Sequence, residues 1–179
     1  SELGLEDVAS FLFLNQAFTA LISVFTVAIS PFWLKISLLN GINDAPSLRR
    51  VTIYGYLCWF FIVIASYLLV DLIVEFLKIW SSGKIIVLRE MVFYFFLYFS
   101  TQTLNAINSS ILNGTGKVKV QYVIGVSQVI LMIGLFSIIK VDASLPEFIV
   151  IIIYVSLSSA VVSAFFVFKD IFLQWNHDD

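Results

Sequence analysis

The chain has 179 residues, of which 60% are hydrophobic and only 12% are charged, and its mean hydropathy is +1.01. A water-soluble domain of this size could not bury that much apolar surface, so these values argue against a soluble protein. The net charge of −2, with basic residues scattered over several short segments, argues against a nucleic-acid partner.

Charged residues fall in short clusters and leave five charge-free segments: 8–34, 51–70, 91–116, 120–139 and 148–168. Crossing a hydrocarbon core of about 30 Å requires about 20 helical residues, and each segment reaches that length. Helices satisfy their own backbone in lipid, whereas barrel strands would alternate polar and apolar residues in shorter segments. We therefore predict an all-α membrane protein, a single domain over 1–179. Its five transmembrane helices are expected at about 8–34, 51–77, 91–113, 120–139 and 147–168.

The first predicted helix contains two amides, Asn15 and Gln16, near one end and a proline, Pro31, near the other. Asn15 and Gln16 could line an aqueous cavity or bond to neighbouring helices, and bonding is the preferred interpretation. Pro31 lacks a backbone donor, so a kink or the end of the helix is expected there. Trp33 would then lie at the level of the lipid headgroups.

The second predicted helix follows a polar loop and is expected to extend beyond the membrane. Asp44 is placed to cap its first turn, with Pro46 inside that turn. Beyond residue 70, charged residues recur at helical spacing, and Glu75 and Lys78 are placed to form an ion pair. We therefore predict one continuous helix whose last turns protrude from the membrane.

The third predicted helix is the most polar of the five. Its second half contains Thr101, Gln102, Asn105, Asn108, Ser109 and Ser110. Three- and four-residue spacings put most of these on one broad face, which must meet protein or water. Gln102, Asn105 and Asn108 could line a cavity that offers uncharged groups to sugar hydroxyls, or they could bond to other helices. Both interpretations stay open for these amides, whereas the two serines are expected only to pack or bond within the protein.

Small residues dominate the remaining contacts that we expect between helices. In the fifth helix, Ser156, Ser159, Ala160 and Ser163 form a stripe suited to close packing. In the fourth helix, Gly125, Gln128 and Gly134 are expected to pack as well. Gly114 and Gly116 would permit the tight turn between the third and fourth helices.

Basic residues are unequally divided between the two ends of the predicted helices. One side holds six, at Lys35, Arg49, Arg50, Lys117, Lys119 and Lys169, and the other holds four, including Lys140. The positive-inside rule then places the C-terminus in the cytoplasm and the N-terminus outside. Because the chain starts with Ser1 in an acidic stretch, we expect further sequence upstream.

Catalytic and metal-binding patterns are absent from the sequence. No Asp, Glu, Lys, Arg or His lies in the middle of a predicted span, so no proton relay or ion site can be drawn within the five helices. Cys58 is the only cysteine, and His177, the only histidine, lies near the end of the chain. We expect no enzyme activity, no cofactor and no metal site.

Three motifs, in the same order along the chain, are similar to those of one transporter family. They are Ser-Pro-Phe-Trp at 30–33, Asp44 followed by Arg49 and Arg50, and Leu-Asn-Gly-Thr-Gly-Lys at 112–117 followed by Gln121. The chain thereby resembles the polysaccharide transporters of the O-antigen flippase type, in the superfamily that includes multidrug and toxin extrusion (MATE) transporters. Leu-Lys-Ile-Trp at 77–80 also resembles the family pattern. The charged cavity residues of the family have no counterpart that we can locate here.

The resemblance implies that the five helices correspond to helices eight to twelve of a twelve-helix transporter with two lobes. It implies that the protein flips an undecaprenyl-pyrophosphate-linked oligosaccharide across the bacterial inner membrane, for lipopolysaccharide O-antigen or another polysaccharide. The expected partners are membrane lipid, that lipid-linked substrate, an N-terminal lobe and polysaccharide assembly proteins. The cavity candidates are Gln102, Asn105, Asn108, Asn15 and Gln16.

Three other functions are considered. A drug or small-molecule exporter would have the same fold, because fold does not determine substrate. A membrane interaction or assembly subunit would have the helices without transport. A membrane enzyme, such as an oligosaccharide polymerase or an acyltransferase, would show acidic, basic or histidine residues converging near a membrane surface, and such residues are sparse here.

Overall fold

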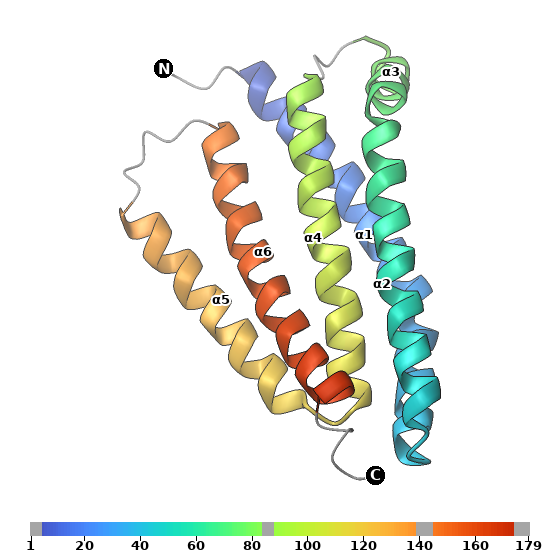
Figure 1. Cartoon of the computed structure of the whole chain (residues 1–179). Helices are drawn as coiled ribbons and strands as arrows, with labels where there is room; N and C mark the ends of the chain where they lie inside the picture. Colours follow the sequence, from blue (N-terminus) through green and yellow to red (C-terminus); the bar gives the residue numbers. More distant parts are fainter. Residues whose placement is uncertain (1–4, 84–87, 139–144, 174–179) are drawn as a thin grey trace.

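The computed structural model describes residues 5–83, 88–138 and 145–173, and every major element in them is helical (Figure 1). The elements are α1 (Leu5–Gly41), α2 (Ala45–Leu68), α3 (Val70–Trp80), α4 (Arg89–Gly114), α5 (Val118–Ile138), α6 (Leu145–Phe168) and a final π-helical turn, η1 (Lys169–Leu173). The predicted all-α class is confirmed. Lys140 and His177 lie outside the described residues.

Four helical segments are long and apolar enough to cross a membrane. They are Val8–Gly41, Ala45–Leu68, Val118–Ile138 and Phe148–Leu173. The helix predicted at 91–113 is present as α4, with 26 residues, but its polar second half keeps it out of this set. Four of the five predicted spans are therefore supported as membrane helices by both length and composition.

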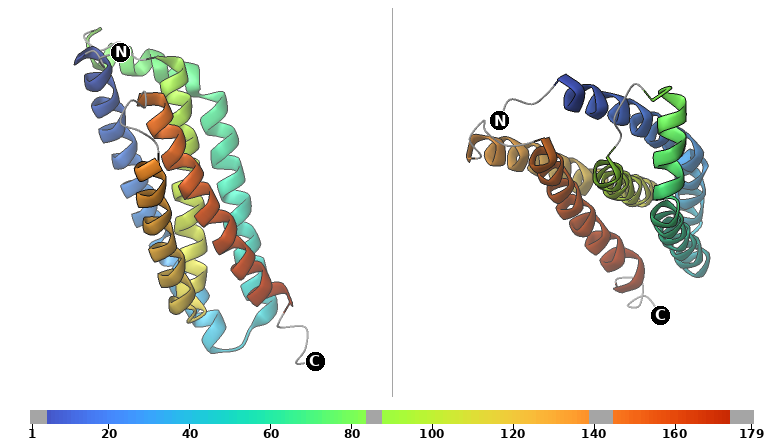
Figure 2. Two further views of the ribbon diagram at one scale, coloured as in Figure 1. Left: turned by 90° about the vertical axis from the view of Figure 1, so that its left-hand side faces the viewer. Right: turned by 90° about the horizontal axis from the view of Figure 1, so that it is seen from above.

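α4 lies at the centre of the bundle, with α1, α2 and α6 packed around it (Figures 1 and 2). Its first half contributes buried aromatic residues: Phe18 of α1 stacks on Phe95 with ring centroids 5.3 Å apart and meets Phe96 edge-on at 4.9 Å. α5, in contrast, has no buried residue. α4, the least apolar of the long helices, is therefore the one most enclosed by other helices.

Pro31 lies inside α1, which continues for ten more residues to Gly41. Of the two outcomes expected at this proline, a kink or the end of the helix, the helix end is therefore wrong. Pro31 cannot donate a hydrogen bond to the carbonyl of Val27, four residues earlier. The hydroxyl of Ser30 donates to that carbonyl instead, at 2.9 Å, so the acceptor is not left without a partner in an apolar environment.

The continuous helix predicted over 51–77 is also wrong, because the chain turns at Leu69 and begins α3. α3 lies across the end of the bundle rather than extending α2 (Figure 2). Its buried residues Val70, Val74 and Leu77 face the aromatic core. Burial of this apolar face explains why the segment folds back against α1 and α4 instead of protruding.

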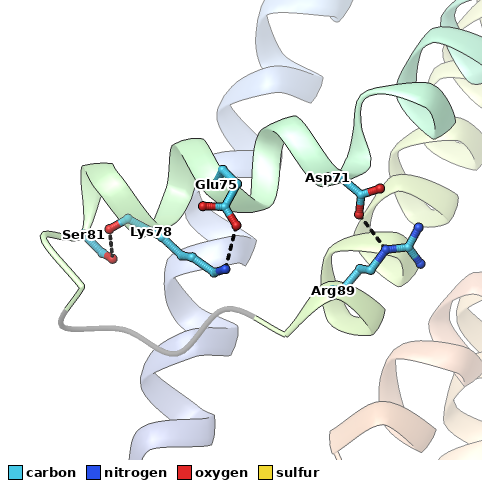
Figure 3. A network of polar contacts seen from close by, with 5 residues as sticks. All are labelled: Asp71, Glu75, Lys78, Ser81 and Arg89. Carbon is cyan, nitrogen blue, oxygen red and sulfur yellow. Dashed lines mark hydrogen bonds and ion pairs between the residues drawn. The ribbon is translucent and has the colours of Figure 1, made fainter.

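In the described part of the chain, two ion pairs lie on the exposed side of α3 (Figure 3). The predicted pair of Glu75 and Lys78 is confirmed, with 2.8 Å between Oε1 and Nζ. A second pair was not predicted: Arg89, at the start of α4, donates to Asp71 at 2.6 Å. That hydrogen bond holds the pKa of the Asp71 carboxyl below its usual value. Charged residues and tryptophan together are typical of segments at the level of the lipid headgroups.

Asp44 caps α2 as predicted. Its carboxylate accepts a hydrogen bond from the backbone N–H of Ser47 at 3.1 Å, and Pro46 lies in the first turn. Hydrogen bonds from the side chain and backbone of Ser47 lower the pKa of Asp44. The cap therefore contributes stability above the unfolded pKa of the carboxyl, and this contribution is lost as pH falls through the lower folded value.

Glycines at the α4–α5 turn have two different uses. Gly116 has a φ of +77°, so it provides the left-handed conformation that the turn requires. Gly114 is still helical, and a Cβ atom there would overlap the side chain of Ile36 in α1. Gly125 and Gly134 of α5 have open space around them, so the prediction that they pack against another helix is wrong.

Thr52 of α2 is fully buried, and its hydroxyl oxygen has no hydrogen-bond partner. Thr52→Val keeps the shape and removes this oxygen, so we expect it to raise the free energy of unfolding by about 1 to 3 kcal/mol. Thermal unfolding in detergent micelles measures the change. Thr103→Val is the control, because Thr103 is equally buried but its hydroxyl donates to the Ser100 carbonyl at 2.9 Å. A gain no larger than that of the control would contradict the prediction.

Candidate functional site: polar faces of the helices

The three amides predicted on α4 all point to α6 and bond to it. Gln102 Nε2 lies 3.1 Å from Ser156 Oγ, and Asn105 Nδ2 donates to the Ser156 carbonyl at 3.3 Å. Asn108 Nδ2 donates to the Ala160 carbonyl at 3.0 Å. The structure thus brings these three residues together in one seam between two helices, in the arrangement that the interhelical-bonding interpretation describes.

α2 also forms hydrogen bonds with α4. The Tyr56 hydroxyl donates to Asn108 Oδ1 at 2.7 Å, and Trp59 Nε1 donates to the Ser100 carbonyl at 2.9 Å. Asn108 is fully buried, and its amide joins α2 on one side to α6 on the other. Neither Tyr56 nor Trp59 was among the predicted site residues, because an aromatic residue in an apolar segment gives no sequence signal of its partner.

The small residues predicted on α6 allow α6 to approach α4 closely enough for these hydrogen bonds to form. Ser156, Ser159, Ala160 and Ser163 are all buried, with exposed fractions of 2%, 9%, 0% and 7%. Small side chains let helix backbones approach, so that amides on α4 reach α6 carbonyls directly. The packing role predicted for this stripe is therefore confirmed.

A second polar face runs along α1 and remains exposed. It contains Asn15 and Gln16, which were predicted, and continues through Thr19, Ser23, Thr26, Ser30 and Ser37, which were not. We call these seven residues the α1 polar stripe. From Asn15 to Ser30 their three- and four-residue spacing is a sequence signal that would have found them, since it repeats over about four turns of helix. Ser37 follows Ser30 by seven residues, which returns to the same face.

The α1 polar stripe faces away from α2 and α3. On the opposite flank of α1, Phe13 meets Trp80 of α3 with ring centroids 4.9 Å apart, and Phe32 lies against Gly55 of α2. At 3.6 residues per turn, the stripe lies about half a turn from these contacts. All seven stripe residues are exposed, so no helix among the described residues packs closely on that side of α1.

The stripe offers uncharged hydrogen-bonding groups to its surroundings. Ser23 and Thr26 donate to carbonyls of their own helix at 2.9 and 2.8 Å, so their oxygens keep free acceptor capacity. The amides of Asn15 and Gln16 are exposed and form no hydrogen bond within the described part of the chain, so the bonding to neighbouring helices that was preferred for them is not found there. In lipid, each amide without a partner would cost several kcal/mol, so this face must meet water, substrate or other protein.

One end of the bundle is basic. The last turns of α1, the first turns of α2, the α4–α5 turn with the start of α5, and η1 lie there. They contribute Lys35, Arg49, Arg50, Lys117, Lys119 and Lys169. Arg49 Nε donates to the Ile171 carbonyl at 3.1 Å, and Lys117 lies 3.8 Å from Asp170. These contacts bring together the three segments that the sequence assigns to the same side of the membrane.

No group of three His, Cys, Asp or Glu side chains that could hold a metal ion occurs in 5–83, 88–138 and 145–173. Comparisons with protein-family models, with curated protein sequences and with solved structures give no match to this chain.

Proposed function

We propose that the chain forms part of a membrane transporter that moves lipid-linked oligosaccharide units across the bacterial inner membrane. The observation that carries this proposal is the α1 polar stripe, an exposed polar face on a helix that is otherwise apolar enough to span a membrane. A wall of hydroxyl and amide groups without charges suits sugar hydroxyls, which exchange hydrogen bonds readily with such groups. The three transporter-like motifs support the same substrate class.

In this proposal α4 is a fifth membrane-crossing helix. Its 26 residues correspond to about 39 Å, enough to cross the hydrocarbon core. Its amides tolerate that position because α6 and α2 satisfy them. The helices then belong to the C-terminal lobe of a twelve-helix, MATE-like transporter, and the basic end faces the cytoplasm with the C-terminus.

The first experiment asks whether the stripe meets water. Cys58, the only cysteine, is replaced by serine, and single cysteines are introduced at Thr19, Ser23 or Thr26. We expect these to react with a membrane-impermeant thiol reagent in intact membranes. The matched control is a cysteine at Val24, which is 69% exposed but lies off the stripe, and it should stay unreactive.

The second experiment asks whether the stripe serves transport. In cells that make the complete protein, Thr19→Leu combined with Ser23→Leu should lower O-antigen display strongly, because the cavity wall loses its polar groups. Val24→Leu with Val27→Leu is the control and should leave display unchanged at equal protein levels. Normal display by the stripe variant would refute the proposed role of these residues.

The two experiments also separate the alternative functions. Unreactive stripe cysteines would indicate a protein-covered face and favour a membrane interaction subunit. Reactive cysteines with normal glycan display and altered resistance to small molecules would favour an exporter of the same fold.

A further inference from the structure

α5 and α6 enclose a slot that the proposed transport path does not use. Its volume is about 570 Å³, and its surface is mainly apolar, with Val123, Leu131 and Val162 among the lining residues; Ser127, Gln128, Ser158 and Ser159 also line it. At one end, Phe136 stacks on Phe148 with ring centroids 5.1 Å apart. At the other end, Val120 and Phe166 both pack against the core cluster beneath α1 and α4.

The length of the slot matches one leaflet of a membrane. Along α5 it extends from Lys119 to Leu131, which is about 18 Å of helix. Half of the hydrocarbon core is about 15 Å thick. A slot with apolar walls in that position excludes water and is filled by hydrocarbon.

A single cation marks the end of the slot at the basic side of the bundle. Lys119 has no ion-pair partner among the described residues, whereas the neighbouring Lys117 lies 3.8 Å from Asp170. A lysine at the headgroup level attracts an anionic lipid, and its flexible stem lets the ammonium group reach the phosphate.

We propose that this slot is a binding site for an anionic phospholipid, with one acyl chain between α5 and α6 and the phosphate at Lys119. The apolar walls accommodate the acyl chain of the lipid, and the unpaired positive charge of Lys119 attracts the anionic headgroup. The site requires only that α5 and α6 lie in a membrane, and it does not depend on transport of an oligosaccharide.

The test uses the full chain in vesicles containing phosphatidylglycerol or phosphatidylcholine with a photoreactive diazirine in the acyl chain. We expect phosphatidylglycerol to label peptides of α5 and α6 that line the slot. Val123→Trp or Val162→Trp fills the slot and should remove most of this labelling. Val129→Trp is the control, because Val129 is as exposed as Val123 (58% and 61%) but lies on the other side of α5.

The headgroup is tested separately. Lys119→Gln should lower labelling by phosphatidylglycerol about fivefold, the effect of one lysine near an anionic headgroup, and leave labelling by phosphatidylcholine unchanged. Lys35→Gln removes the same charge elsewhere at the basic end and should have little effect.

Three results would overturn the site. In the first, the lipid labels both sides of α5 equally. In the second, neither tryptophan substitution lowers the labelling of the slot. In the third, another protein, such as a second copy of the chain, cross-links to the slot in place of lipid. Equal labelling by the two lipids in the unaltered protein would overturn the role of Lys119. Helical content by circular dichroism and a single elution peak check that each variant folds. The cysteine and display experiments on α1 remain interpretable whatever the result here.

Discussion

Replacing Asn108 with leucine is expected to lower the free energy of unfolding by about 2 to 3 kcal/mol. The change removes two hydrogen bonds, from Tyr56 at 2.7 Å and to the Ala160 carbonyl at 3.0 Å, at a fully buried position. The Tyr56 hydroxyl then stays buried without its acceptor, which costs more than the bond itself contributes. Unfolding in mixed micelles of increasing SDS content measures the loss.

A double-mutant cycle with Tyr56→Phe isolates the contact with Asn108. If the two side chains interact as the 2.7 Å distance indicates, Asn108→Leu should cost less in the Tyr56→Phe background than in the unaltered protein. Asn105→Leu is a second comparison, since Asn105 is only half-buried and its single bond is longer, at 3.3 Å. Strictly additive losses from Tyr56→Phe and Asn108→Leu would show that the pair contributes nothing.

Gly114→Ala is expected to cost about 1 to 3 kcal/mol, although alanine favours helices. The added Cβ would overlap the Ile36 side chain and lie 3.1 Å from the Ser37 backbone nitrogen, so α1 and α4 must move apart. That movement would disturb the core cluster formed by Ile36, Ile107 and Ile111. Thermal unfolding in micelles should show a lower midpoint temperature.

The matched control for this prediction is Gly125→Ala in α5. Gly125 is also helical, but a Cβ atom there meets nothing within 4 Å. Alanine should therefore stabilise that position by up to about 1 kcal/mol through its higher helix propensity. If both substitutions changed stability equally, the close approach of α1 and α4 would not be the reason for glycine at position 114.

The positions of the long helices could be predicted because the absence of charge over about 20 residues is a local property of the sequence. The turn at Leu69 could not, because residues 70–80 continue a helical pattern, and only the packing of Val70 and Val74 on the core sets their direction. The end of the first helix at Pro31 was wrongly expected for a similar reason. The sequence shows the lost donor, but the replacement bond from the Ser30 hydroxyl is visible only in the structure.

The polar residues illustrate a second limit of sequence analysis. Asn15 of α1 and Asn108 of α4 are the same residue type in comparable helices; the sequence favours bonding to another helix for Asn15 and leaves both interpretations open for Asn108. Asn108 is enclosed because α2 and α6 lie on either side of it, whereas Asn15 is exposed and has no such neighbour among the described residues. Which polar groups are enclosed therefore depends on helix arrangement, which helix-period patterns do not determine.

The central position of α4 has a consequence for biosynthesis. Its amides at 102, 105 and 108 bond to α6 groups that lie 51 to 54 residues later in the chain. At ribosomal rates of about 5 to 20 residues per second, roughly 3 to 10 s pass before those acceptors are made. If α4 crosses the membrane as proposed, it must wait during that interval in the translocation channel or beside α1 and α2, so its insertion is a cooperative step completed only by the last helix.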